Sequence, residues 1–423
     1  MKLKKTIAMS SLQCSYMIER EVELGGIGVA CHAYIEFKAT ENINLDLLIK
    51  SWGTLFMVHP LMGAFCSEYG VLEIKENRSS NNGNNYAIWD EKYCNIEFIR
   101  EKYSKNSLNV KNGENAKLHI LSKKGLVTYI VFEFDLTAFD ILSFMIIIRD
   151  LSDIYLNLRE YKSYNIRETE YLDESKSKYL NSRENKEYWI ERLFNGDIKL
   201  PLKTKLKIEN VKEHEYVCIN KVINSRKYNL LKKIKDKYNI ELEELLLIIF
   251  CYVFLNYKKT SSIYINYIYT NRIEKEINTV ADFTSNLIYK CDIDYRLSLD
   301  EFIIKAREKI RDDKKHSQFD GVAVQRLIKQ KGRNNEKYLI PIVFSPALKI
   351  PLISKEFKNC FGDLEYIISQ TPGVLLDAQT YVIEEKLFIT WVFLKNCVYE
   401  SEVDLLLNKY VETIDSLIDS SIV

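Results

Sequence analysis

The sequence lacks a strong charge of either sign, and it lacks a long hydrophobic run. Its 60 Lys and Arg residues are balanced by 59 Asp and Glu residues, and a net charge of +1 creates no overall field that would attract nucleic acid or an anionic membrane. The most apolar stretch, residues 245–255, is much shorter than the roughly 20 residues that a membrane-spanning helix needs. Residues 1–13 are basic at the start but contain no apolar signal-peptide segment. We therefore expect a cytoplasmic protein.

Motifs for disulfides, metals and nucleotides are also missing. The nine cysteines include no C-x-x-C pair, and their odd number argues against a disulfide framework, so we expect reduced thiols. The five histidines are too dispersed to form a metal-ligand cluster. Neither G-x-G-x-x-G nor G-x-x-x-x-G-K-[ST] occurs, so the sequence does not indicate dinucleotide or ATP binding. We expect a protein without a bound metal or cofactor.

The sequence does contain a polar cluster at a predicted strand-to-helix junction. Residues 128–134 are β-branched and aromatic, as in a buried strand, and residues 139–158 are apolar enough for a buried helix. Asp135, Asp140 and Ser143 lie at this junction, and the last two are one helical turn apart. Such junctions lie at the open edge of a sheet, where α/β folds tend to place their chemistry. The simpler alternative is that Asp135 merely caps the following helix.

The chain is predicted to form two α/β lobes, residues 1–160 and 188–423. Residues 161–187 between them are rich in Lys, Glu, Asn and Tyr, which indicates a solvated helical connector. Hydrophobic periodicity predicts the main elements of both lobes. Helices are expected at 11–20, 45–57, 226–238, 242–257, 299–312 and 403–417, and strands at 32–37, 263–268, 287–292, 340–344 and 387–393.

The junction matches the D-x-x-x-x-D-x-x-S signature of heterocyclization domains of nonribosomal peptide synthetases. The related condensation domains carry H-H-x-x-x-D-G at the same place. Further segments resemble the heterocyclization family in the same order along the chain. They are residues 9–20 (MSSLQCSYMIER), 24–37 (LGGIGVACHAYIEF), 58–62 (VHPLM), 188–193 (YWIERL), 271–272 (NR), 281–285 (ADFTS), 316–324 (HSQFDGVAV), 341–348 (PIVFSPAL) and 369–377 (SQTPGVLLD). An ordered likeness of this length is far more specific than one short motif.

This resemblance implies both a fold and an activity. The fold is a pair of chloramphenicol-acetyltransferase-like lobes in a V-shaped pseudo-dimer, with a tunnel at the seam. Donor and acceptor carrier proteins dock at opposite mouths, and their phosphopantetheine arms carry the substrates inward. The implied reaction condenses a tethered acyl or peptidyl thioester with tethered Cys, Ser or Thr, and then cyclodehydrates the product to a thiazoline or oxazoline.

The resemblance also assigns functional residues. By this resemblance, Asp377 and Ser345 correspond to the acid–base pair of cyclodehydration. A carboxylate is a base at pH 7, and burial would let it donate a proton as well. Asp140 is expected to form an ion pair with Arg272 that supports the site. Leu136 replaces the second histidine, so histidine catalysis is excluded at this position. The other motif residues are Asp135, Ser143, Asp282, Thr284 and Gln370.

Several residues depart from the family pattern, and some of them adjoin the presumed cyclodehydration residues. Ser345-Pro346 replaces Thr-Ser, and the other departures are Ala281 for Gly, Gly373 for Gln, Ala378 for His, and Thr390-Trp391-Val392 for N-W-D. They make condensation a firmer expectation than cyclization. One alternative is therefore an amide-forming condensation or acyl-transfer enzyme. The other, from a different class, is a catalytically silent docking module of a synthetase.

Overall fold

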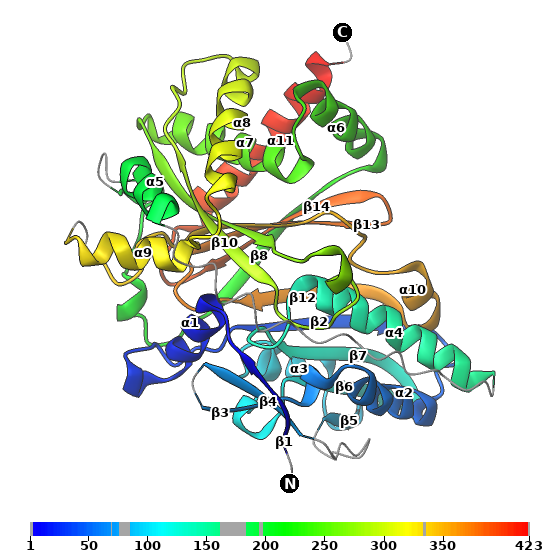
Figure 1. Ribbon diagram of the computed structural model, residues 1–423. Coiled ribbons are helices and arrows are strands. Elements are labelled where there is room, and N and C mark those ends of the chain that lie inside the picture. Colours follow the sequence, from blue (N-terminus) through cyan, green and yellow to red (C-terminus); the bar gives the residue numbers. More distant parts are fainter. Residues whose placement is uncertain are drawn as a thin grey trace. The chain divides into compact units, whose positions relative to one another are not determined.

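The protein is described by a computed structural model that covers residues 3–68, 70–75, 85–160, 183–193, 198–332 and 336–421 (Figure 1). Contacts between Cα atoms divide the chain into two compact units. Unit 1 comprises residues 1–175, 270–284 and 353–372, and unit 2 comprises residues 176–269, 285–352 and 373–423. The predicted connector, residues 161–187, lies outside the described residues except for 183–187, so its character stays a prediction.

The described part of unit 1 contains a five-stranded sheet of order β12-β2-β7-β6-β5 and a three-stranded sheet of order β1-β4-β3. The strands are β1 (Leu3–Ala8), β2 (His32–Ala39), β3 (Phe65–Glu68), β4 (Val71–Lys75), β5 (Tyr86–Asp90), β6 (Ala116–Lys123), β7 (Leu126–Asp135) and β12 (Gly362–Gln370). The helices are α1 (Ser11–Arg20), α2 (Leu45–Val58), α3 (Ile96–Tyr103), α4 (Ile141–Arg159) and α10 (Lys355–Phe361). Strand β12 pairs antiparallel with β2, which places a late segment of the chain in unit 1 although the sequence assigned it to the second lobe.

The five-stranded sheet of unit 1 has two different faces, because side chains alternate along each strand. One face is aromatic: Phe37 and Phe132 pack against Phe357 of α10, and Phe132 also contacts Trp52 of α2. The opposite face is polar yet buried, with Glu36 accepting two hydrogen bonds from Arg100 of α3. A buried charge is tolerated there because it is paired.

That polar face also carries a histidine–glutamate group. Glu133 lies within ion-pair distance of His119 and His32, and all three side chains are fully buried. Burial opposes the ionisation of Glu133, but the contacts with the two histidines outweigh it and lower its pKa to about 2. Asn106 adds a hydrogen bond of 3.0 Å to the same carboxylate. The charged layer therefore holds the loop after α3 against the sheet.

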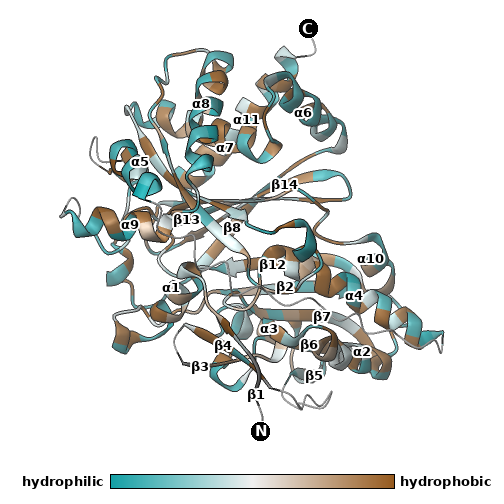
Figure 2. Ribbon diagram, viewed as in Figure 1, coloured by the Kyte–Doolittle hydropathy of each residue, from teal (hydrophilic) through white to brown (hydrophobic). Residues whose placement is uncertain are grey.

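The described part of unit 2 contains a six-stranded sheet of order β10-β9-β11-β13-β14-β8. Its strands are β8 (Tyr216–Ile223), β9 (Ile263–Thr270), β10 (Thr284–Cys291), β11 (Ile342–Ala347), β13 (Leu376–Ile383) and β14 (Lys386–Leu394). Its helices are α5 (Arg183–Leu193), α6 (Ser225–Tyr238), α7 (Leu242–Lys258), α8 (Leu299–Lys315), α9 (Gly321–Gln330) and α11 (Glu400–Ser420). Helix α7 and strand β14 are hydrophobic along most of their length (Figure 2).

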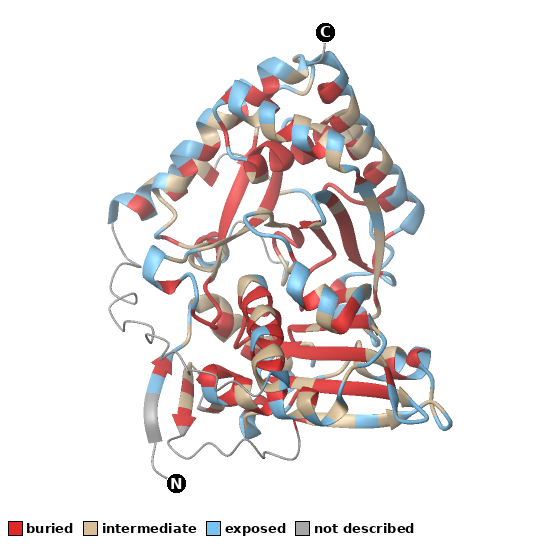
Figure 3. Ribbon diagram, turned by 90° about the vertical axis from the view of Figure 1, so that its right-hand side faces the viewer, coloured by how far each residue is buried: buried red, intermediate tan, exposed pale blue. Residues whose placement is uncertain are grey.

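Helices α7 and α11 cover one face of the sheet in unit 2. Trp391 of β14 and Phe344 of β11 contact Phe250 of α7, and Trp391 also contacts Tyr410 of α11. Strands β7, β13 and β14 are largely buried, whereas helices such as α6, α8 and α11 bury one side and expose the other (Figure 3). This amphipathic arrangement supplies most of the stability of each helix.

The predicted helices and strands are present with small shifts at their ends. The helix predicted at residues 139–158 begins at Ile141, because Asp140 is its N-cap. Several elements were not predicted, namely the strands of the three-stranded sheet, strands β5, β6, β8, β12 and β13, and helices α3, α9 and α10. All nine cysteines are free thiols, and no helix in the described ranges is both long and apolar enough to span a membrane.

Candidate active site

The strand-to-helix junction of unit 1 is organised by Asp140. This residue has an extended backbone at the N-terminus of α4, and its Oδ1 accepts the backbone N–H of Ser143 at 2.7 Å. A short polar acceptor at this position satisfies one of the unpaired N–H groups of the first helical turn. Asp135 therefore does not cap the helix, and the alternative prediction for that residue is wrong.

Asp140 forms the predicted ion pair with Arg272. The Arg272 Nη2–Asp140 Oδ1 distance is 2.7 Å, the Nε–Oδ2 distance is 3.2 Å, and each side chain is 4% exposed. Arg272 Nη1 also donates to the carbonyl oxygens of Glu276 and Thr279. A two-pronged contact of this kind fixes the guanidinium plane as well as its charge. Arg272 thus links helix α4 to the segment 270–284.

Ser143 connects the same segment to the helix. Its Oγ lies 2.7 Å from both Asp140 Oδ1 and the carbonyl oxygen of Ala281, and it accepts the N–H of Ala281 at 3.0 Å. Arg272 donates to this oxygen at 3.0 Å. Asp140, Ser143 and Arg272 therefore form one hydrogen-bonded group, which supports an architectural role.

Asp135 has a separate cation. Its Oδ2 pairs with Nη2 of Arg20 at the end of α1, and its Oδ1 accepts the N–H of Thr137 at 3.0 Å. Arg20 also donates to the carbonyl oxygen of Leu108 at 2.8 Å. Arg20 was part of a matched segment, but its role was not predicted because the partner is distant in sequence. The pair anchors α1 at the end of β7.

Asp282, Thr284 and Gln370 also lie in unit 1. Asp282 Oδ1 accepts the N–H of Thr284 at 2.9 Å. Gln370 ends strand β12, and its amide donates to the carbonyl oxygens of Ala30 at 3.2 Å and Asn106 at 3.4 Å. Gln370 is buried, and these contacts hold loops around the sheet.

Ser345 and Asp377 meet in unit 2, on the sheet face opposite α7. They come from the parallel neighbours β11 and β13. Ser345 Oγ donates to Asp377 Oδ1 at 2.7 Å, and Gln379 Nε2 donates to Asp377 Oδ2 at 2.7 Å. Burial raises the pKa of Asp377, although the hydrogen bonds from Gln379 and Ser345 act in the opposite direction. Gln379 was missed, but it follows Asp377 by two residues, so strand alternation places both on one face.

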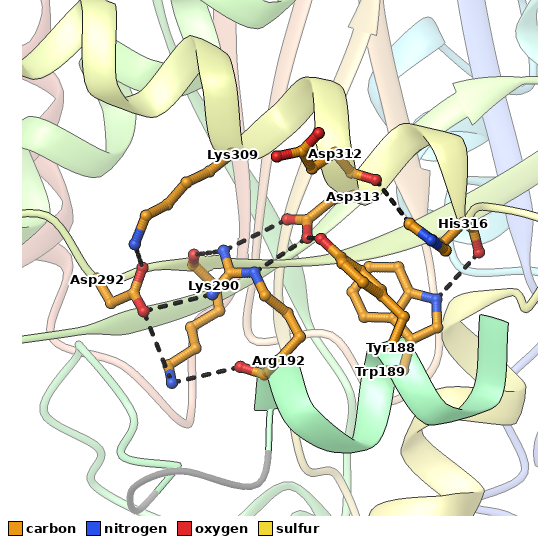
Figure 4. Close-up of polar contacts among 9 residues, drawn as sticks. All are labelled: Tyr188, Trp189, Arg192, Lys290, Asp292, Lys309, Asp312, Asp313 and His316. Carbon is orange, nitrogen blue, oxygen red and sulfur yellow. Dashed lines mark hydrogen bonds and ion pairs between the residues drawn. The ribbon is translucent and has the colours of Figure 1, made fainter. Parts of the chain in front are cut away.

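A third polar cluster explains the Y-W-x-x-R-L segment (Figure 4). The Tyr188 hydroxyl donates to Asp313 Oδ1 at 2.6 Å, and Arg192 Nε donates to the same oxygen at 3.0 Å. Trp189 Nε1 donates to the carbonyl oxygen of His316 at 3.0 Å, and the Tyr188 and His316 rings stack at 3.7 Å. Asp313 is fully buried, which raises its pKa despite Arg192. These contacts fix α5 against α8 and indicate a structural role.

The donor sets of these sites do not suggest a metal centre. Among the described residues, no group of three or more His, Cys, Asp and Glu side chains is placed to hold a metal ion. Arginine, hydroxyl and amide groups surround the acids instead. The arrangement is suited to hydrogen bonding and proton transfer.

A family model described as "Condensation domain" matches residues 4–359. The chain belongs to the condensation domain family. This confirms the family suggested by the ordered motifs, and with it a mixed α/β fold of the condensation-domain type. The predicted V and tunnel concern the placement of the two units, and they stay predictions.

The condensation domain is similar to parts of several large synthetases. It is 22% identical to bacitracin synthase 1 of Bacillus licheniformis, over 97% of this chain and 8% of that protein. It is 21% identical to pyochelin synthetase PchE of Pseudomonas aeruginosa, over 98% of this chain and 29% of that protein. A phenyloxazoline synthase, MbtB of Mycobacterium tuberculosis, is 31% identical over 26% of this chain and 8% of that protein. The chain thus spans less than a third of each of these relatives.

Solved structures show the same fold. The cyclization-docking bidomain of EpoB from Sorangium cellulosum superposes with a TM-score of 0.86, at 19% identity, over 98% of this condensation domain and 84% of that chain. An epimerization domain of tyrocidine synthetase B has a TM-score of 0.77 at 14% identity, with 98% and 96% coverage. Identities this low establish the fold alone.

Proposed function

We propose that this condensation domain is a heterocyclization domain. It would join a carrier-tethered acyl or peptidyl thioester to carrier-tethered Cys, Ser or Thr, and close the product to a thiazoline or oxazoline. The observation that carries this proposal is the buried Asp377 carboxyl, hydrogen-bonded by Ser345 and Gln379. The similarity to a cyclization domain and to synthetases supports it.

The condensation step depends strongly on the positioning of its two substrates. The amine of the acceptor attacks the thioester carbonyl, the C–N bond forms, and the donor thiol leaves. Thioesters are activated acyl donors, so holding both groups at near-attack distance supplies much of the rate. Asp140 and Arg272 support this step indirectly, because they fix segment 270–284 to α4.

Cyclodehydration is harder and requires proton transfer. The side-chain thiol or hydroxyl of the acceptor attacks the new amide carbonyl, and the former carbonyl oxygen is lost as water while the C=N bond forms. In this proposal Asp377 takes the proton of the nucleophile as a carboxylate and delivers it to the former carbonyl oxygen. It then takes the N–H proton of the amide as the C=N bond forms, and this second proton completes the water that leaves. The raised pKa of Asp377 suits both tasks. Ser345 and Gln379 orient the carboxyl group and stabilise its charged form.

The partners would be a donor and an acceptor carrier protein or domain. Their phosphopantetheine arms would present the substrates, so the domain itself would need no bound cofactor. The cytoplasmic location expected from the sequence stays a prediction.

One observation favours a second candidate, an amide-forming condensation domain without cyclization. Gly373 stands where the family has Gln, and its φ is +77°, which favours glycine. A Cβ at this position would lie 2.5 Å from the Tyr338 ring. A glutamine here would require the Tyr338 ring to move, and glycine supplies no side chain in its place.

The experiment that separates these candidates is intact-protein mass spectrometry of the acceptor carrier. A carrier loaded with Cys, Ser or Thr is mixed with an acyl-loaded donor carrier and the domain. Acyl transfer followed by loss of one water supports heterocyclization. Acyl transfer without that loss supports amide formation alone. No transfer to any of the three acceptors, with folded and loaded carriers, favours a silent docking module.

A further inference from the structure

Asp282 differs from the other two aspartates of the unit 1 site in its lack of an arginine partner among the described residues. Asp140 pairs with Arg272, and Asp135 pairs with Arg20. Asp282 takes part in no ion pair among the described residues, although it is only 9% exposed. Burial without a paired cation disfavours the charged form of a carboxyl and raises its pKa.

The position of Asp282 is tightly set by its neighbours. The N–H of Ala281 donates to Ser143 Oγ at 3.0 Å, and the N–H of the residue after Asp282 donates to Asp140 Oδ2 at 3.3 Å. Asp282 Oδ1 accepts the N–H of Thr284. Its Oδ2 is buried and has no hydrogen-bond partner within the described part of the chain. The carboxyl is thus held in one place with one oxygen uncommitted.

The surroundings keep this oxygen protonated near neutral pH. Burial and the negative charge of Asp140 raise the pKa of Asp282 to about 8, against the opposing effects of Thr284 and Arg272. The buried Cys31 thiol is a further titratable neighbour of Asp282, and burial raises its pKa as well. Two neighbouring carboxyls whose surroundings push their pKa values apart can take different roles, one structural and one in proton transfer.

We propose, resting on the proposed function, that Asp282 is a catalytic acid of the condensation step and protonates the sulfur that leaves the donor thioester. The C–N bond forms between amine and carbonyl carbon as the C–S bond breaks. The sulfur leaves with the Asp282 proton as the thiol of the donor arm. The Asp282 carboxylate then takes a proton from the new amide nitrogen, which restores the acid. The products are one amide and one thiol.

The test compares Asp282→Asn with the intact domain in single-turnover condensation, measured by carrier mass spectrometry from about pH 6 to about pH 9.5. Asparagine keeps the size and the Oδ1 contact but transfers no proton. Asp46→Asn, on the exposed start of α2, is the matched control. We expect the rate of the intact domain to fall above about pH 8 as Asp282 loses its proton. Asp282→Asn should lose about 10²- to 10⁴-fold in rate with carrier affinity unchanged, and its rate should show no such fall. Asp282→Glu should restore part of the rate.

A second measurement keeps the proposal independent of activity. The ¹³C resonance of the Asp282 carboxyl, assigned as the signal missing in Asp282→Asn, should titrate near the raised pKa in the free domain. An ordinary titration near pH 4 overturns the proposal. So does a folded Asp282→Asn variant that condenses at the rate of the intact domain, which leaves the proposed function standing. An intact domain that condenses no acceptor overturns the proposed function, while the titration still decides whether Asp282 is a neutral acid.

Discussion

The buried aspartates of the two units differ in their partners. In unit 1, Arg272 binds Asp140 through a bidentate contact, and its positive charge holds the carboxylate in place. In unit 2, Asp377 receives hydrogen bonds from a hydroxyl and an amide, and no cation contacts it among the described residues. A carboxylate paired with arginine is fixed as part of the framework. A carboxyl held by neutral donors keeps a raised pKa and can exchange protons near neutral pH.

Replacing Asp377, the acid held by neutral donors, should give the largest loss of activity. We expect Asp377→Asn to reduce cyclodehydration by about 10²- to 10⁴-fold, because asparagine can neither accept the proton of the nucleophile nor return it. Condensation should continue, so the uncyclized acyl-Cys carrier should accumulate in mass spectra. Asp404→Asn, on the exposed face of α11, serves as the control. Cyclization by Asp377→Asn at the original rate would remove Asp377 from the mechanism.

Removing the cation of the framework pair should mainly lower stability. Arg272→Ala leaves the Asp140 charge buried and unpaired, and we expect the free energy of unfolding in urea to fall by about 3–5 kcal/mol. The double variant Asp140→Asn/Arg272→Ala should recover part of this loss. Arg183→Ala breaks an exposed pair with Glu187, whose side chains are 92% and 61% exposed, and should change stability by less than about 0.5 kcal/mol. Equal effects of the two arginine variants would contradict the distinction between buried and exposed pairs.

The pH dependence of stability should separate the paired acid of unit 1 from the unpaired one. The pKa of Asp282 is raised from 3.8 to about 8, so between these values the folded chain holds a proton that the unfolded chain has released. Folding then takes up a proton, and this residue's contribution to stability falls as pH rises from about 4 to about 8 and is constant above that. Melting temperatures across this range should show a smaller decline in Asp282→Asn. An unchanged decline would place the proton uptake elsewhere.

Altering the neutral donor to Asp377 should give the smallest effect. Ser345→Ala removes one hydrogen bond worth about 0.5–1.5 kcal/mol, which corresponds to roughly a tenfold loss in rate at most. The charged form of Asp377 loses a donor, so its pKa should rise and the ascending limb of the cyclodehydration pH profile should move to higher pH. Ser345→Thr keeps the hydroxyl and should leave the profile in place. A loss as large as that of Asp377→Asn would mean that the hydroxyl acts directly on the substrate.

Local patterns predicted much of the fold and part of the site. The junction of β7 and α4 followed from hydrophobic composition, and the Asp140–Arg272 pair followed from family motifs. The helix start was displaced because Asp140, and not Asp135, satisfies its first N–H groups. The partner of Asp135 and the addition of β12 to β2 were missed, since neither leaves a signal in neighbouring residues.

By itself, the sequence determined the family, the order of the longer helices and of several strands, and which acids lie at their ends. These properties depend on periodicity, capping and ordered motifs, which involve residues close together in the sequence. Only the tertiary structure decided which acids are charged and which are neutral. Arg272 reaches Asp140 across 132 positions of sequence. Asp282 has no ion pair within the described ranges because Arg272, the arginine that acts on it, is bound to Asp140. The protonation of a buried carboxyl depends on distances between such remote residues, and these exist only once the chain has folded.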